Sequence, residues 1–370
     1  MTSTTADPVL VTGAFGQAGS RCTEILLGRG RTVIAMDLRN DKTVAVAERL
    51  AAGSGPGTLV PAYVDLLDVE AVTALVAQHQ PQAIIHLAAI LAPTSYKNPR
   101  LARKVNVGGT QNVVSAACAL ASPPLFVYAS SAAVYGSRNP HRHPERITAD
   151  TPINPADHYG EDKVESEKII SGSGLPHALL RLAGVISPDG MAGAGPEHLV
   201  LMRALPGNNR IHTVDGRDVA MAFANAVDRR ETIDGKVLLI GGDSTHERTH
   251  RELEDDMMGA VGLGRLGPTA SLPGDPDDDD GWGPTGWFDT TESQALLDFQ
   301  HHDWTQTVSS IADAQGVRRN VLSAVGPFVR PVLRQVLKVQ RRIEKRGRYA
   351  DPWALVGTKF GNDALAPTDF

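Results

Sequence analysis

Short apolar runs alternate with amphipathic stretches through the first half of the chain. Six of these runs predict β-strands: Val9–Val11, Thr32–Met36, Leu59–Val64, Ala83–His86, Leu125–Ala129 and Ala178–Leu182. Four stretches between them predict helices: Gly19–Leu27, Val44–Ala51, Val69–Gln78 and Leu101–Leu120. Strands that are apolar throughout are typical of a parallel sheet covered on both faces. The alternation therefore predicts an α/β fold with a doubly wound parallel sheet.

The pattern becomes less regular after Gly184. Residues 218–227 predict a helix and residues 236–240 predict a late strand. Four consecutive aspartates, Asp277–Asp280, follow among glycines and prolines. Because consecutive side chains do not converge on one ion without a turned loop such as that of an EF-hand, we expect an exposed loop here and no metal site.

Charge is distributed unevenly along the 370 residues, whose formal net charge is −6. Residues 317–348 carry ten Lys and Arg side chains against one acidic residue, Glu344, which gives this segment a net charge of +9. The rest of the chain therefore carries −15. Because an acidic body repels nucleic acid, we expect no nucleic-acid partner.

Composition excludes several other classes of protein. The two cysteines, Cys22 and Cys118, are too few for a disulfide framework or a four-thiolate zinc site. No apolar run approaches the roughly 20 residues that cross a bilayer. Residues 1–8 lack the basic and apolar parts of a signal peptide. We therefore expect a cytoplasmic protein.

A glycine motif follows the first predicted strand at once, in the sequence Thr12-Gly-Ala-Phe-Gly-Gln-Ala-Gly. Gly13 permits a tight turn, Gly16 lets the backbone approach a pyrophosphate, and Gly19 allows the next helix to pack closely on the strand. The helix N-terminus then offers N–H groups and a partial positive charge to the anion. The residues of this motif that we expect at a dinucleotide are Gly13, Phe15, Gly16 and Gln17.

An acidic residue, Asp37, ends the second predicted strand 18 residues after Gly19. At this spacing a carboxylate accepts hydrogen bonds from the adenosine ribose of NAD and repels the 2′-phosphate of NADP. Arg39 offers a phosphate partner and weakens that discrimination. The third predicted strand ends at Asp65. Its carboxylate would either accept a hydrogen bond from the adenine amino group or cap the next helix. The pattern predicts NAD rather than NADP as the cofactor.

Tyr159 and Lys163 are four residues apart in a segment that predicts a helix, so they share one helix face. A tyrosine with a pKa near 10 is a poor base at neutral pH. A neighbouring ammonium stabilises the phenolate, which makes proton exchange with an alcohol or carbonyl feasible. The fifth predicted strand runs on into two hydroxyl residues, Ser130 and Ser131, at the sheet edge where open α/β sheets bind ligands.

Taken together, these motifs resemble the extended short-chain dehydrogenase/reductases, the NAD-dependent epimerase/dehydratase family. The matching elements are the glycine motif at 13–19, Asp37, Asp65-Leu66, His86-Leu-Ala-Ala89, Val105-Asn-Val-Gly-Gly-Thr110, the Ser130-Ser131 strand end, and Tyr159 with Lys163. Their order and spacing agree with the family over about residues 8–188. The resemblance implies a Rossmann-type sheet and a homodimer.

The resemblance also implies roles for individual residues. Ser131 would hydrogen-bond the substrate oxygen, Tyr159 would be the general acid/base, and Lys163 would bind the nicotinamide ribose while lowering the tyrosine pKa. Further cofactor contacts would come from Asp65, Leu66, Leu87, Ala88, Ala89 and Asn106, and Asn106 would also support the site from the following helix. Because the serine, tyrosine and lysine are all present, the resemblance favours an enzyme over the alternative of a non-catalytic NAD(P)-sensing regulatory protein.

Departures from the family pattern after the sixth predicted strand bear on the substrate. Sugar-nucleotide members of the family carry an Asn where this chain has Gly184, and a Tyr-Gly pair where it has Ile186 and Ser187. We therefore predict an NAD-dependent oxidoreductase that interconverts a less polar secondary alcohol and its ketone. A nucleotide-sugar epimerase is the alternative. Dehydration is disfavoured because Ala132 and Ala133 follow the serine in place of an Asp-Glu pair.

The predicted organisation has three parts. Residues 1–183 are expected to form the NAD-binding domain with the catalytic residues. Residues 184–316 are expected to form a substrate-binding region, either separate from the first domain or with its elements interleaved among those of the first domain. Residues 317–370 are expected to form a basic helical extension. Within the extension, Pro327 and Pro331 favour a regular helix that begins near Pro331. One hypothesis docks this amphipathic helix on the acidic body or at a dimer interface, with solvated basic groups. The other places residues 317–348 on a membrane surface.

Overall fold

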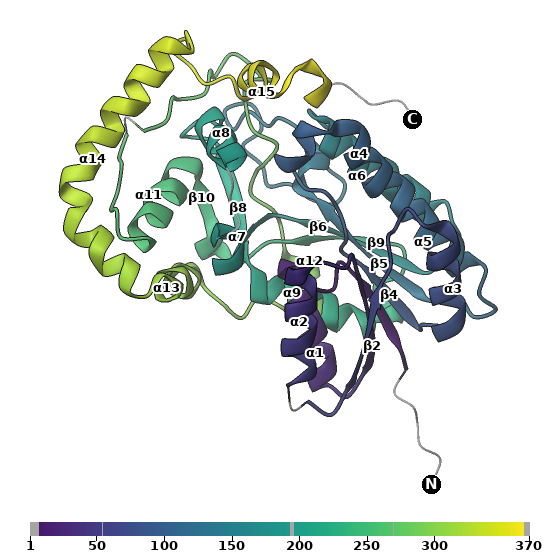
Figure 1. Ribbon diagram of the computed structural model, residues 1–370. Coiled ribbons are helices and arrows are strands. Elements are labelled where there is room, and N and C mark those ends of the chain that lie inside the picture. Colours follow the sequence, from purple (N-terminus) through teal and green to yellow (C-terminus); the bar gives the residue numbers. More distant parts are fainter. Residues whose placement is uncertain (1–6, 54, 193–195, 269, 366–370) are drawn as a thin grey trace.

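Seven parallel strands form the main sheet of the computed structural model, which describes residues 7–53, 55–192, 196–268 and 270–365 (Figure 1). In spatial order they are β3 (Thr58–Tyr63), β2 (Thr32–Asp37), β1 (Val9–Thr12), β4 (Ala83–His86), β5 (Leu125–Ser131), β6 (His177–Leu182) and β9 (Lys236–Ile240). All neighbouring strands are parallel. The predicted doubly wound sheet is confirmed.

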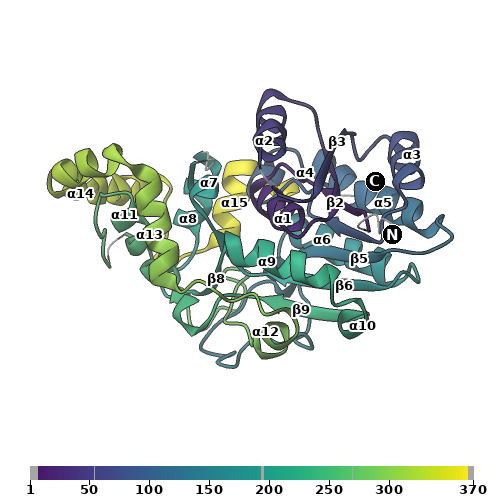
Figure 2. The ribbon, with the colours of Figure 1, turned by 90° about the horizontal axis from the view of Figure 1, so that it is seen from below.

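Helices cover both faces of this sheet because successive side chains of each strand point to opposite sides. In β1, Val9 and Val11 pack into one core and Leu10 packs into the other. The first face carries α1 (Gln17–Gly28), α2 (Asp41–Ala51), α9 (Gly216–Val227), α10 (Arg230–Ile233) and α12 (Thr291–Leu297). The second carries α3 (Val69–His79), α5 (Gly109–Cys118) and α6 (His158–Ser171). Although α1 and α9 are far apart in sequence, they lie side by side (Figure 2).

The connection order creates a crevice at the carboxyl ends of the strands. The chain moves from β1 outward to β2 and β3, and then returns to β4 on the other side of β1. The loops that follow β1 and β4 therefore leave in opposite directions. Open α/β sheets bind their ligands at such a switch point.

A smaller three-stranded sheet follows the main one in sequence. It has the order β10 (Glu247–Thr249), β8 (Arg210–Asp215) and β7 (Gly184–Ile186), with β7 parallel and β10 antiparallel to β8. Its helices are α7 (Pro188–Ala192), α8 (Pro196–Ala204), α11 (His250–Ala260) and α13 (Trp304–Gln315). Between β8 and β10 the chain returns to the main sheet to supply α9 and β9.

The basic extension forms α14 (Val317–Ile343) and α15 (Pro352–Phe360). We predicted a helix from about Pro331, and this prediction is wrong because α14 continues through both Pro327 and Pro331. A proline removes one intrahelical hydrogen bond, but contacts with the body hold the helix on both sides of the pair. Arg319 donates to the Ala260 carbonyl at 3.1 Å. Farther along, Arg334 donates to the Leu266 carbonyl at 2.7 Å.

Two other features of the surface bear on the sequence predictions. The side chains of Asp277–Asp280 are exposed as expected, and Asp279 pairs with Arg142 at 2.8 Å. Among the described residues, every helix is too short or too polar to cross a bilayer.

Candidate active site

The glycine motif forms the turn between β1 and α1, and its backbone geometry explains two of the glycines. Gly13 has a φ of 66°, and a Cβ there would lie 2.9 Å from the Ala88 backbone nitrogen. A Cβ on Gly19 would lie 2.0 Å from the Gly13 carbonyl oxygen. Gly16 caps α1, and among the described residues no side chain caps this helix end. The first N–H groups of α1 are thus left to bind an anion.

Asp37 links the end of β2 to the glycine turn. Its Oδ2 accepts a hydrogen bond from the Phe15 N–H at 3.0 Å, and its Oδ1 accepts one from the Leu38 N–H at 2.8 Å. A carboxylate has acceptor capacity for more than two bonds, so Asp37 can also receive ribose hydroxyls. Arg39 lies with its guanidinium 5.0 Å from the centroid of the Tyr63 ring.

A cavity of about 390 Å³ lies at the carboxyl ends of β1 and β4. The predicted residues that line it are Gly13, Gly16, Gln17, Asp37, Asp65, Leu66, Leu87, Ala88, Ala89, Tyr159 and Lys163. Asp65 Oδ1 accepts a hydrogen bond from the Leu67 N–H at 3.0 Å, whereas the cap of α3 is Asp68. The capping alternative for Asp65 is therefore wrong, and its side chain lies at the cavity.

Three of the predicted site residues lie outside this lining. The Phe15 side chain is buried against Tyr63, so its part in a cofactor site is limited to its backbone, a correction to the prediction. Asn106 sits in a π-helical turn, Lys104–Gly108, which joins α4 (Pro99–Arg103) to α5. Its amide bonds both the N–H and the carbonyl of Ile90, at 2.8 and 3.1 Å, and so fixes the cavity wall after β4. The third residue, Ser131, is the last residue of β5.

Ser131, Tyr159 and Lys163 come together where β5 ends beside α6. Ser131 Oγ accepts a hydrogen bond from the Ala133 N–H at 3.2 Å, and the Ser131 side chain is near enough to Tyr159 to lower its pKa. Lys163 Nζ donates to the Ala129 carbonyl at 2.7 Å and lies 5.7 Å from the centroid of the Tyr159 ring. A Cβ on Gly160 would lie 2.6 Å from the Ala133 carbonyl oxygen, so a glycine between the tyrosine and the lysine lets α6 approach the strand end.

Burial controls the ionisation of this group of side chains. It raises the pKa of Tyr159 well above its ordinary value. The nearby carboxylates of Asp157 and Asp162 raise this pKa further, whereas the Ser131 side chain lowers it. Burial also lowers the pKa of Lys163 to about 8, against the opposing effect of Asp162 and Glu167. We expected Lys163 to lower the tyrosine pKa, but desolvation of the phenolate dominates in this structure. Near pH 7 the site holds a neutral phenol beside an ammonium.

Gln17 connects the glycine motif to the smaller region. Its Nε2 donates to Ser187 Oγ at 2.6 Å, and Ser187 Oγ also accepts from the Gly190 N–H at 3.2 Å. Close by, Arg21 pairs with Asp189 at 2.6 Å. These contacts join α1 to the segment that follows β7.

A buried network behind the serines was missed by the sequence interpretation. Ser130 Oγ donates to Glu167, which accepts two hydrogen bonds from Arg181, at 3.0 and 2.7 Å. Arg181 also donates to the Tyr135 hydroxyl at 2.8 Å. The network joins β5, β6 and α6 beneath the site. Two sequence signals point to it: Arg181 interrupts an apolar strand, and Glu167 follows Tyr159 by eight residues on the same helix face.

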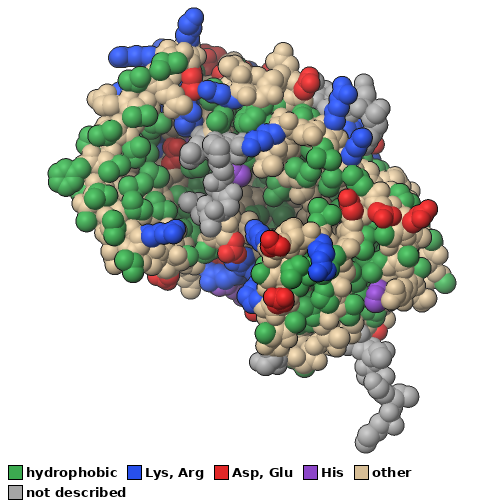
Figure 3. All heavy atoms as spheres, in the orientation of Figure 1, with side chains coloured by type: hydrophobic (Ala, Val, Ile, Leu, Met, Phe, Trp, Pro, Cys, Tyr) green, Lys and Arg blue, Asp and Glu red, His purple; other side chains and the backbone are tan. Residues whose placement is uncertain are grey.

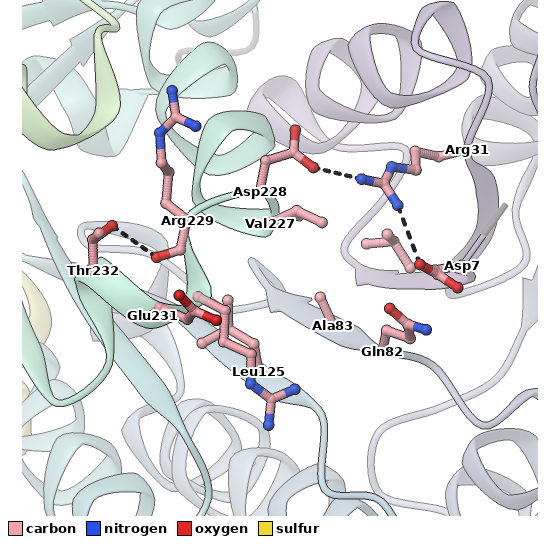
Figure 4. A pocket seen from close by; sticks show the side chains of 12 residues that line it. Asp7, Arg31, Gln82, Ala83, Leu125, Val227, Asp228, Arg229, Glu231 and Thr232 are labelled. Carbon is pink, nitrogen blue, oxygen red and sulfur yellow. Dashed lines mark hydrogen bonds and ion pairs between the residues drawn. The ribbon is translucent and has the colours of Figure 1, made fainter.

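A second cavity, of about 480 Å³, lies at the other end of the strands, where their amino ends are (Figure 4). It is lined by the first residues of three strands, Val9, Ala83 and Leu125, together with charged side chains. The guanidinium of Arg31 bridges Asp228 at 2.5 Å and Asp7 at 3.8 Å there. Because it opens at the amino ends of the strands, this cavity is separate from the glycine turn and the serine, tyrosine and lysine.

The fold and the site together define a class of protein. A parallel sheet with a glycine turn after β1, an acidic residue after β2 and a Ser/Tyr/Lys group beside the cavity is the arrangement of an extended short-chain dehydrogenase/reductase. The chain belongs to the NAD dependent epimerase/dehydratase family, whose sequence model matches residues 9–241. This match confirms three predictions: that the chain belongs to this family, that it is an enzyme, and that its cofactor is NAD.

Two similar relatives within the family are UDP-glucose 4-epimerases. A UDP-glucose 4-epimerase of Lactobacillus helveticus is 33% identical over 253 residues, which cover 67% of this chain and 68% of the relative. A UDP-glucose 4-epimerase of Mycolicibacterium smegmatis is 36% identical over 160 residues, or 43% and 48% of the two chains. The relatives support the epimerase alternative better than our main prediction of an alcohol–ketone oxidoreductase.

Solved structures share the fold at low sequence identity. A UDP-glucuronic acid 4-epimerase variant from Bacillus cereus, in complex with NAD and UDP-4-deoxy-4-fluoro-glucuronic acid, superposes with a TM-score of 0.68 at 18% identity. It covers 83% of this chain and 98% of its own. The UDP-Glc/GlcNAc 4-epimerase of Campylobacter jejuni has a TM-score of 0.67 at 20% identity and covers 84% and 99% of the two chains.

Proposed function

We propose that the protein is an NAD-dependent epimerase that inverts a secondary carbinol centre of a nucleotide sugar. The observation that carries the proposal is that Tyr159 and Lys163 line the cavity that also holds the glycine turn, with Ser131 at the adjoining end of β5. Membership in the family and the relatedness to UDP-glucose 4-epimerases support the sugar-nucleotide class of substrate.

The glycine turn and the Asp37 carboxylate fit the pyrophosphate and the adenosine ribose of NAD. Side chains at Gly13 and Gly19 would occupy backbone space, and Asp37 retains acceptor capacity beside the turn. When bound there, NAD supplies the acceptor and donor of a hydride. The protein supplies orientation and manages one proton.

The proton moves between the substrate hydroxyl and Tyr159 Oη. When the carbinol is oxidised, its hydroxyl proton passes to the phenolate of Tyr159, and when the ketone is reduced the neutral phenol returns it. Ser131 holds the substrate oxygen by a hydrogen bond. The Lys163 ammonium favours the phenolate electrostatically. Because burial raises the pKa of Tyr159, the oxidation step is expected to accelerate as the pH rises from 6 toward 8.

A second candidate function is the interconversion of a less polar secondary alcohol and its ketone. The observation that favours it is the composition of the cavity lining, to which Leu91, Leu182 and Val185 contribute aliphatic side chains. In addition, Gly184 offers no side chain to a substrate nucleotide at the start of β7.

The test is to incubate the protein with NAD and either UDP-glucose or UDP-galactose, and to analyse the sugars by chromatography. An epimerase produces the partner sugar without net formation of NADH. The parallel assay supplies NAD and a panel of secondary alcohols and follows nicotinamide absorbance. Accumulation of NADH with an alcohol, together with no epimer from either sugar, would replace the first proposal with the second.

The variant Tyr159→Phe tests the assigned chemistry in either case. We expect turnover to fall by about 10²–10⁴-fold, the usual contribution of a positioned acid/base, while the affinity for NAD changes little. Tyr349→Phe, in the C-terminal extension and outside the cavity lining, is the matched control and should keep full activity. Turnover by Tyr159→Phe at the level of this control would reject the mechanism.

A further inference from the structure

An apolar stripe runs along the exposed side of α14. Its members are Val317, Val321, Val325, Phe328, Val332, Val336, Val339 and Ile343. They recur at intervals of four, four and three residues, which keeps them on one face of a helix. Phe328 is 78% exposed and Ile343 is 74% exposed. These eight side chains are the majority of the fourteen large hydrophobic ones that are exposed in the described part of the chain.

The stripe is a formed surface of the folded protein. The helix of 27 residues is about 40 Å long, at 1.5 Å per residue, and lies along the outer edge of the molecule (Figure 1). Hydrophobic side chains gather along this edge in the space-filling view (Figure 3). The family match ends at residue 241, so α14 lies outside the part that the family shares.

Arginines hold the opposite side of the helix against the body. Arg319, Arg334 and Arg341 donate to backbone carbonyls at the end of α11 and in the loop after it. Carbonyls at a helix end need donors, and an apolar face offers none. A Cβ on residue 326 would lie 3.0 Å from the Leu263 carbonyl oxygen, so the glycine at this position lets α14 approach the loop after α11 closely. These contacts fix the stripe in its outward orientation.

The exposed surface beside the stripe carries positive charge. Arg318 lies near its start, and Lys338, Arg342 and Lys345 lie near its end, all exposed. The one acidic residue of the segment, Glu344, faces inward, where it pairs with Arg203 at 2.7 Å and with Lys359 at 3.2 Å. An apolar stripe flanked by cations fits a surface that is both apolar and anionic.

A second copy of this chain fits the stripe less well. Paired in parallel, two α14 helices would bring Lys338, Arg342 and Lys345 against the same cations. Paired in antiparallel, they would bring these residues against Arg318 of the other copy. Either arrangement concentrates like charge along the contact. In contrast, anionic lipid headgroups neutralise these side chains, and the acyl boundary receives the apolar stripe.

We propose that α14 is a preformed docking surface for an anionic lipid bilayer, on which it lies parallel to the membrane plane with its valine, phenylalanine and isoleucine side chains in the interface. The protein associates with the membrane peripherally, through one face of one helix. This association is independent of the activity proposed above, because α14 is separate from the cavity residues.

Flotation of the full-length protein with lipid vesicles tests the proposal. One set of vesicles contains phosphatidylcholine alone, and the other contains equal parts of phosphatidylcholine and phosphatidylglycerol. We expect the protein to float with the anionic vesicles and to be released as salt is raised. For the double variant Phe328→Asp/Val336→Asp, the fraction of protein that floats with the anionic vesicles should fall at least tenfold. The double variant Lys338→Glu/Lys345→Glu should bind anionic vesicles no better than neutral ones.

Matched controls separate lipid binding from a general effect of added charge. Val69→Asp and Leu101→Asp place the same charge on exposed apolar positions of α3 and α4, and should float like the unmodified protein. All variants should keep the thermal midpoint of the parent, because the substituted side chains are exposed.

Three results would overturn the proposal. The first is that the unmodified protein stays unbound with anionic vesicles, and the second is that the aspartate and glutamate variants float as well as the controls. The third concerns the oligomeric state, measured by light scattering during size-exclusion chromatography. A dimer that becomes a monomer in Phe328→Asp/Val336→Asp, without vesicle binding by the parent, would assign the stripe to a second copy of the chain.

Discussion

Removal of the buried charge of Glu167 should destabilise the protein far more than removal of a surface charge. The side chains of Arg181 and Glu167 are 7% and 8% exposed, and two hydrogen bonds, of 3.0 and 2.7 Å, join them. In Glu167→Gln the guanidinium of Arg181 stays buried without its counter-charge. Loss of one partner of a buried pair costs about 3–5 kcal/mol, so we expect the free energy of unfolding to fall by this amount.

The matched control is Glu292→Gln, which removes the same charge from a surface pair. Glu292 pairs with Lys236 at 2.7 Å, but the two side chains are 57% and 40% exposed. Exposed pairs of this kind contribute about 0–1 kcal/mol. Urea unfolding followed by circular dichroism measures both variants under the same conditions.

A double variant separates the pair from its buried charge. Glu167→Leu/Arg181→Leu removes both charges, and buried pairs replaced by apolar residues are often neutral in stability. The Tyr135 hydroxyl keeps the Thr148 carbonyl as an acceptor at 3.0 Å. We therefore expect the double variant to be more stable than Glu167→Gln. Equal losses in Glu167→Gln and Glu292→Gln would refute the reasoning.

Three further predictions concern the cavity. Gly19→Ala should abolish NAD binding in a nucleotide titration, because its Cβ would lie 2.0 Å from a backbone oxygen, whereas Gly28→Ala, with no atom within 4 Å of its Cβ in the described structure, should bind normally. Asp37→Ser should weaken NAD binding by about tenfold to a hundredfold, the value of a hydrogen bond to a charged group, and should narrow the preference over NADP; unchanged affinities would reject this role. The pKa of Lys163 is lowered from 10.5 to about 8 by folding, so between pH 8 and pH 10.5 the unfolded chain holds a proton that the folded protein has lost. The free energy of unfolding should therefore rise with pH over this range. Urea unfolding at successive pH values measures this rise, which Lys163→Met should remove.

The sheet and the cofactor side of the site were predictable because their signals are local. Apolar runs placed the strands within two residues of their observed bounds. The glycine triplet and Asp37 act through backbone geometry at a strand end, which follows from the order of elements along the chain. In the same way, Tyr159 and Lys163 needed only the helical repeat to be placed on one face.

The support behind the site was not predictable, because it joins residues from separate elements. Ser130, Glu167 and Arg181 belong to β5, α6 and β6, and only the pairing of β5 with β6 brings them together. Asn106 was expected to contact the cofactor and to support the site, but its partner was not predictable: the π-helical turn directs its amide to Ile90 in the cavity lining. The pKa of Tyr159 likewise depends on burial by the whole site rather than on the lysine one turn away.

The extension shows why an amphipathic pattern alone leaves the docked face of a helix undetermined. Residues 317–348 predicted a helix with an apolar face and a basic face, and we expected solvated basic groups on a docked helix. The observed orientation is the reverse for Arg319, Arg334 and Arg341, because the end of α11 and the loop after it present carbonyls that accept hydrogen bonds from these side chains. The free energy of satisfying buried carbonyls thus competes with the burial of valines. A helix that docks by its arginines keeps its apolar face for a second surface, and its remaining exposed cations favour an anionic one.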